Sequence, residues 1–95
     1  MRVERVIWLP AIVDKLASKH DVTPKEVEDV LFHPQLYVRR VERGYRSGED
    51  VYAAMGQSAG GRYLIVFFIY KQSREALIVS ARDMDSHERR TYERR

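Results

Sequence analysis

Apolar positions recur with helical spacing in the first third of the chain and alternate in the remainder. A short apolar segment at residues 3–8 predicts a first strand that ends before Pro10. Residues 10–19 then predict a helix with Pro10 in its first turn and one apolar side. The residues of that side are Ile12, Val13, Leu16 and Ala17.

A second helix is predicted to begin after Thr23. Thr23 is a suitable N-cap, Pro24 fits the first helical position, and Glu26 can close a capping box. The helix is expected to stop before His33-Pro34. Its apolar side consists of Val27, Val30 and Leu31.

The alternating pattern beyond residue 35 predicts four strands joined by turns, followed by one more helix. The strands are expected at 36–43, 51–57, 62–70 and 75–81, with turns at 44–50, 58–61 and 71–74. The final helix begins near Asp85, where Asp85 and Glu88 can form a second capping box. We therefore expect one α+β domain over residues 1–95, in the order β-α-α-β-β-β-β-α, with a mostly antiparallel sheet.

The strand at 62–70 is apolar on both faces, which is typical of a central strand covered from two sides. The two N-terminal helices can cover one face, whereas the short C-terminal helix offers only Met84 and Tyr92 as large apolar groups. We therefore expect a partner chain to complete the burial, with Phe68, Tyr70 and Met84 as its contact residues. The two faces consist of Ile65, Phe67 and Ile69, and of Leu64, Val66, Phe68 and Tyr70.

Composition excludes several classes of protein. The chain has no cysteine, which excludes disulfide scaffolds, thiolate metal sites and cysteine nucleophiles. The longest apolar run, at 63–70, is far shorter than the roughly 20 residues of a membrane helix. The first residues do not have the pattern of a secretory signal. We therefore expect a soluble, cytoplasmic protein with no membrane contact.

Charge is distributed unevenly, and 13 of the 17 basic residues are arginine. Residues 21–35 hold one basic and four acidic groups (1 − 4 = −3), while residues 36–95 hold 12 and 8 (12 − 8 = +4). Because guanidinium groups bind phosphate in a planar, bidentate fashion, the second part suits a polyanion. The alternative is an ordinary basic protein whose arginines are solvated.

Two strand ends and the last helix carry the residues best suited to chemistry. Arg62 opens the central strand and Arg82 closes the next one, so antiparallel pairing brings both to one edge. Arg89 and Tyr92 share a face of the final helix. Guanidiniums and a phenol at one place suit RNA cleavage, in which the 2′-hydroxyl attacks the adjacent phosphorus. Cations then stabilise the transition state, and an acid protonates the leaving 5′-oxygen.

Alternatively, these residues stabilise the fold and take no part in a reaction. Arg62 and Arg82 would pair with surface carboxylates such as Asp83 or Glu88, and Tyr92 would be a core aromatic residue. No metal site or cofactor is expected in either case, because the histidines are isolated in the sequence.

Several short motifs follow one another in a characteristic order. They are Trp8 and Pro10, Lys19-His20-x-Val22, His33-Pro34, Gly48-Glu49, Gly56, Gly61-Arg62-x-Leu64-x-Val66, Ile78-Val79-Ser80-Ala81-Arg82, Glu88-Arg89 and Tyr92. With these motifs the chain resembles the BrnT family, the ribonuclease toxins of bacterial type II toxin–antitoxin systems. The resemblance runs from about Trp8 to Tyr92.

The resemblance implies a RelE-like fold and an endoribonuclease toxin that cleaves messenger RNA and inhibits translation. A cognate antitoxin with a ribbon-helix-helix region would neutralise it, and operator DNA would be bound only through that antitoxin. Ile12 and Val51 stand where the family usually has basic residues, so a weakened nuclease is an alternative. The catalytic residues implied are His20, Arg62, Arg82, Arg89 and Tyr92.

Two points stay open at the level of sequence. His20 is either a general acid or base, or a cap that binds the last carbonyls of the first helix. The protein is alternatively a non-catalytic partner-binding module of the same fold, or a basic regulator that binds nucleic acid. If the protein is a nuclease, the candidate RNA-binding residues are Arg39, Arg43 and Arg46. If it is a regulator, Arg40 would join these three in a phosphate-binding stripe, although strand alternation places Arg40 on the other face.

Overall fold

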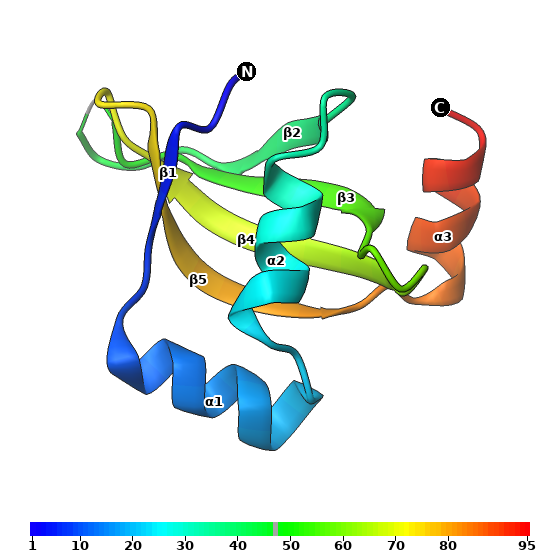
Figure 1. Ribbon diagram of the computed structural model, residues 1–95. Coiled ribbons are helices and arrows are strands. Elements are labelled where there is room, and N and C mark those ends of the chain that lie inside the picture. The colour runs from blue at the N-terminus through cyan, green and yellow to red at the C-terminus, as the bar shows by residue number, and fades with distance from the viewer. Residues whose placement is uncertain (47) are drawn as a thin grey trace.

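The computed structural model describes residues 1–46 and 48–95, and its element order is the one predicted from the sequence (Figure 1). The predicted turn at 44–50 includes Ser47, which lies outside the described residues. The elements are β1 (Arg5–Ile7), α1 (Pro10–His20), α2 (Pro24–Leu31), β2 (Tyr37–Glu42), β3 (Val51–Gln57), β4 (Tyr63–Tyr70), β5 (Glu75–Asp83) and α3 (Ser86–Glu93).

Both predicted capping boxes are present. The Thr23 hydroxyl accepts from the Glu26 backbone N–H at 3.2 Å, and the Glu26 carboxylate accepts from the Thr23 N–H at 3.1 Å. Asp85 and Glu88 make the same reciprocal pair at 2.7 and 2.9 Å. These bonds satisfy backbone donors that a helix N-terminus otherwise leaves unpaired, which is why the starts of α2 and α3 were predictable.

The five strands form one sheet in the order β1-β5-β4-β3-β2. Strands β2 to β5 are an antiparallel meander, and β1 joins its edge parallel to β5. The register pairs Ile65 with Arg82 and Leu64 with Asp83. Strand β5 therefore continues two residues beyond its predicted end, to Asp83.

Helices α1 and α2 cover one face of the sheet, and the main core lies between them and β3 to β5 (Figure 1). A side chain at Gly56 of β3 would place its Cβ 3.2 Å from a methyl group of Val30, so glycine allows α2 to pack closely on the sheet. None of the helices in the described ranges is long and apolar enough to cross a membrane. The largest fully buried side chains include Leu16, Leu31, Leu64, Phe68 and Ile78.

Helix α3 covers only one end of the other face (Figure 1). It buries Ala53, Met55 and Ile65 beneath Tyr92, with Met84 packed alongside. The sheet residues beyond it remain half-buried, and Val79 is 37% exposed. We call this region the open face; its residues are Val51, Phe67, Ile69, Leu77 and Val79.

The positions of Phe68 and Tyr70 differ from the expectation that they line the uncovered face. Phe68 is completely buried on the α1/α2 side. Tyr70 packs against the same core, and its hydroxyl donates to the Arg2 carbonyl. The alternation along β4 was predicted correctly, but the two N-terminal helices cover the even-numbered residues. Of the three expected partner contacts, only Met84 lies on the α3 side.

Candidate functional site

Arg62 joins the ends of three elements on the α1/α2 side. Its Nε and Nη2 donate to the two carboxylate oxygens of Asp83 at 2.7 and 3.1 Å. Nη2 also donates to the His20 carbonyl at 2.9 Å, and Nη1 donates to the Asp21 carbonyl and to Glu26. A guanidinium has five N–H groups, and this arrangement uses all of them.

This arrangement gives Arg62 a structural role. Its hydrogen bonds with Asp83 raise the pKa of Arg62 and lower the pKa of Asp83. No N–H group is left to bind a phosphate. The structural alternative expected this pairing of Arg62 with Asp83. It also expected Arg82 to pair with Glu88 and Tyr92 to be a core aromatic residue, and the structure has both: Arg82 binds Glu88 at 2.8 Å, and the Tyr92 side chain is buried.

The structure does not bring Arg62 and Arg82 together. Both lie at the same end of the sheet, as predicted, but Arg82 is opposite Ile65 and extends over the Phe67 ring on the α3 side, with 5.6 Å from the guanidinium carbon to the ring centre. The expected convergence of the two guanidiniums is therefore wrong. Alternation along the strand places Arg62 on the same side as Leu64, whereas Arg82 lies on the side of its partner Ile65.

Arg82 is held by Glu88. Its Nη1 and Nη2 donate to the two carboxylate oxygens of Glu88 at 2.8 and 2.9 Å. The hydrogen bonds raise the pKa of Arg82 and lower that of Glu88. The same carboxylate closes the capping box of α3 with Asp85, so Glu88 fixes the helix start relative to β5.

Arginine and tyrosine side chains stack on one another along α3. The guanidinium carbon of Arg89 lies 3.9 Å from the centre of the Tyr63 ring, and that of Arg95 lies 3.8 Å from the Tyr92 ring. Tyr92 in turn packs edge-on against Tyr63, with 6.0 Å between ring centres. Nε of Arg89 also lies 3.8 Å from a carboxylate oxygen of Glu93, but the Arg89 side chain is 52% exposed, so an anion from solvent can reach it. We call these two arginines and two tyrosines the Arg–Tyr cluster.

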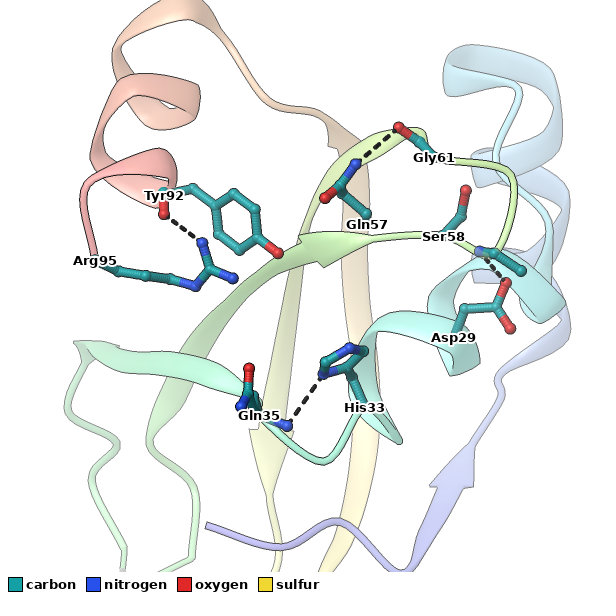
Figure 2. A pocket seen from close by; sticks show the side chains of 9 residues that line it. Asp29, His33, Gln35, Gln57, Ser58, Gly61, Tyr92 and Arg95 are labelled. Atoms are coloured by element: carbon teal, nitrogen blue, oxygen red, sulfur yellow. Dashed lines mark hydrogen bonds between the residues drawn. The ribbon is translucent and has the colours of Figure 1, made fainter.

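A pocket of about 510 Å³ lies beside the Arg–Tyr cluster (Figure 2). Tyr92 of α3 and Arg95, which follows that helix, approach it from one side, and His33 and Gln35 approach from the segment after α2 (Figure 2). The end of β3 and the turn that follows it close the remaining side, together with Asp29 of α2. The lining residues there are Gln57, Ser58, Ala59 and Gly61.

His20 lies away from this pocket, as the last residue of α1. Its carbonyl and that of Asp21 are bound by Arg62, so the guanidinium caps the helix end. Asp21 adopts the left-handed conformation with φ of 53°, which is the usual geometry at a helix C-terminus. The side chain of His20 is near Asp83, whose pKa it helps to lower.

The three candidate RNA-binding arginines are all exposed but do not lie together. Arg39 is opposite Ala53 on the edge strand β2, on the α3 side of the sheet. Arg43 and Arg46 belong to the connection between β2 and β3, at the end of the sheet remote from α3 (Figure 1). Only Arg39 thus shares a face with the Arg–Tyr cluster.

Sequence reasoning missed several residues of the pocket. Glutamines such as Gln35 and Gln57 belong to no motif, and His33 was noticed only as a helix exit. The pocket forms because the end of α2, the β3–β4 turn and α3 meet in space, and no local pattern records that meeting. Within residues 1–46 and 48–95, no group of three or more histidine, aspartate or glutamate side chains is placed to hold a metal ion.

Comparison with known families adds one finding. Residues 8–88 match the model of a family described as the ribonuclease toxin, BrnT, of type II toxin–antitoxin systems. Comparison with curated proteins gave no match.

Proposed function

The chain belongs to the BrnT family of ribonuclease toxins of type II toxin–antitoxin systems, and on that premise we propose that it is an endoribonuclease that cleaves messenger RNA and so inhibits translation. The observation that carries this proposal is the Arg–Tyr cluster beside a pocket. Single-stranded RNA is recognised largely by stacking of its bases on aromatic rings and guanidinium planes, combined with cationic contacts to phosphate.

The proposed reaction begins with attack of the ribose 2′-hydroxyl on the adjacent phosphorus. The O2′–P bond forms, the P–O5′ bond breaks, and the products are a 2′,3′-cyclic phosphate and a 5′-hydroxyl. The O2′ proton passes to solvent, and the Tyr92 phenol gives its proton to the leaving O5′. Arg89 and Arg82 stabilise the extra negative charge on the phosphoryl oxygens. No metal ion or cofactor takes part in this proposed reaction.

His20 and Arg62 are assigned to the fold in this proposal rather than to the reaction. Arg62 has its N–H groups committed to Asp83, Glu26 and backbone carbonyls. Removal of its guanidinium would therefore affect activity through the positions of α1 and β5.

An antitoxin with a ribbon-helix-helix region is the proposed partner, and operator DNA would be bound only through it. The open face supports a contact there, because its half-buried apolar side chains adjoin Arg82 through Phe67. An antitoxin segment on this face would block access of RNA to the guanidiniums. The proposed site of action is the cytoplasm, where messenger RNA is translated.

A weakened nuclease that acts mainly as a partner-binding module is the second candidate. This candidate is favoured by the ion pair between Arg82 and Glu88, because the Glu88 carboxylate occupies the place where a phosphate would bind Arg82. Ile12 packs against the core and Val51 lies on the open face, so neither position supplies a cation.

The test uses purified, partner-free protein and single-stranded RNA in the presence of EDTA. The proposal expects cleavage products with 2′,3′-cyclic phosphate ends. Activity that is lost in EDTA and restored by Mg²⁺ contradicts the mechanism, and complete absence of cleavage with or without Mg²⁺ favours the partner-binding module.

A further inference from the structure

The pocket beside α3 has ordered walls. The Asp29 carboxylate accepts from the Ala59 N–H at 2.9 Å, and the Ser58 hydroxyl accepts from the Arg62 N–H at 3.1 Å. The Gln57 Nε2 donates to the Gly61 carbonyl at 3.3 Å, and the His33 Nδ1 accepts from the Gln35 N–H at 3.1 Å. These bonds hold the pocket in shape before any ligand arrives, which lowers the entropic cost of binding.

The same bonds define which polar atoms remain for a ligand. When Nδ1 of His33 is an acceptor, the neutral imidazole presents Nε2–H as a donor. Gln57 retains its Oε1 acceptor. The side-chain amide of Gln35 has no hydrogen-bond partner among the described residues, so both its NH2 donor and its oxygen acceptor remain for a ligand. Figure 2 shows the Tyr92 ring directed from α3 toward the space above His33, while the Gln57 side-chain amide is turned toward Gly61.

The charge balance of the pocket favours a neutral polar group over a second phosphate. Asp29 is anionic, because its hydrogen bond with Lys25 lowers its pKa, and Arg95 is cationic. Among the residues that line the pocket, a bare phosphate would meet one guanidinium and one carboxylate, and that carboxylate is also paired with Lys25 at 2.6 Å. A nucleobase, by contrast, is neutral and carries donors and acceptors along its edge, and it can stack on a tyrosine or guanidinium plane.

We propose that this pocket binds one base of the single-stranded RNA substrate and determines the cleavage preference, with Gln35, Gln57 and His33 contacting its edge. The proposal rests on the nuclease function proposed above. The volume of the pocket, about 510 Å³, is within the range of pockets that hold small organic ligands. Since Tyr92 lines both the pocket and the Arg–Tyr cluster, a base held here would be joined to a phosphate near Arg89.

The test is to map cleavage sites on an RNA of randomised sequence by sequencing the product ends. The wild type, Gln35→Ala and Gln57→Ala are compared, with Gln72→Ala as the matched control in the exposed turn between β4 and β5. The wild type should prefer one base by about tenfold or more at a position flanking the cut. Gln35→Ala and Gln57→Ala should reduce that preference to about threefold or less, while Gln72→Ala retains it.

The outcomes separate this inference from the function on which it rests. Cleavage by the wild type with no base preference, or with a preference that both pocket variants retain, overturns the base pocket and leaves the nuclease function standing. Failure of the wild type to cleave any RNA overturns the proposed function, and the base pocket with it. Thermal unfolding of each variant shows whether a lost preference reflects a lost fold; Gln35→Ala removes no side-chain hydrogen bond among the described residues and is decisive if Gln57→Ala is unstable.

Discussion

Arg62 and Asp83 form a two-point pair in which Nε and Nη2 of the guanidinium bind the two carboxylate oxygens at 2.7 and 3.1 Å. The remaining N–H groups of Arg62 bind Glu26 and the carbonyls at the end of α1. One side chain thus joins β5 to the first two helices.

Arg62→Ala should therefore lower the stability of the protein. The substitution removes the donor of the Asp83 carboxylate and of two carbonyls, while Glu26 keeps its bond from Thr23, and we expect a loss of about 2–3 kcal/mol. For a domain of this size, that corresponds to a fall of about 10–20 °C in Tm. Arg5→Ala is the control, because Arg5 is 67% exposed and its pair with Glu75 should contribute less than about 1 kcal/mol. A variant with the Tm of the wild type but cleavage reduced about 100-fold would show that Arg62 is catalytic.

Asp21→Gly should stabilise the protein. Asp21 has φ of 53°, where glycine has no steric penalty, and its carbonyl bond to Arg62 does not depend on the side chain. We expect a gain of about 0.5 kcal/mol, measured by urea unfolding. Asp14→Gly makes the same exchange at an exposed position inside α1 and should cost about 0.3–0.5 kcal/mol. Equal losses in the two variants would contradict this interpretation of the helix end.

Acid should weaken the fold through Glu88. Its folded-state pKa lies below the ordinary value of 4.5, because Arg82 stabilises the charged form. The unfolded chain therefore takes up the proton first, so this contribution is complete above pH 4.5 and is lost as the pH falls through the lower folded-state pKa. Glu88→Gln can keep the capping box but removes this titration. Its free energy of unfolding should fall less than that of the wild type between pH 5 and pH 3, and identical profiles would exclude Glu88 as a source of acid sensitivity.

Val79→Asp should weaken binding of the proposed antitoxin. Val79 is 37% exposed on the open face, and burial of a charge in an apolar contact is costly. The affinity, measured by titration calorimetry, should fall about tenfold or more. Leu9→Asp is the control, since Leu9 is 47% exposed and precedes α1 on another part of the surface. If both variants bind as the wild type does, the antitoxin contacts a different surface.

Local sequence signals were sufficient for the fold but not for the site. The pairs Thr23 with Glu26 and Asp85 with Glu88 define helix starts through contacts three residues apart, and a pattern of that range is visible in sequence. The direction of the Arg62 side chain depends on where the end of α1 lies relative to β5. Even its nearest partner in sequence, Asp83, is 21 residues away, so no local pattern shows the contact. The ion-pair partners of a charged side chain depend on how the helices and strands pack. The sequence therefore indicated which arginines matter but not which groups each of them binds.

The covering of β4 illustrates the same limit. Alternation correctly separated Ile65 from Phe68, yet it could not say which set the N-terminal helices would cover. That choice follows from the packing of α1 and α2 on the sheet, which buries Phe68 and leaves Phe67 half-buried on the other side.

The most direct test of the proposed RNA site compares Arg89→Ala with Arg90→Ala in cleavage of single-stranded RNA. Both residues are exposed on α3, but only Arg89 is placed over the Tyr63 ring, at 3.9 Å. We predict that Arg89→Ala lowers the cleavage rate about 100-fold, the typical cost of one transition-state donor, while Arg90→Ala stays within about threefold of the wild type. Equal effects of the two substitutions, or full activity of Arg89→Ala, would contradict the assignment of RNA cleavage to this face of the protein.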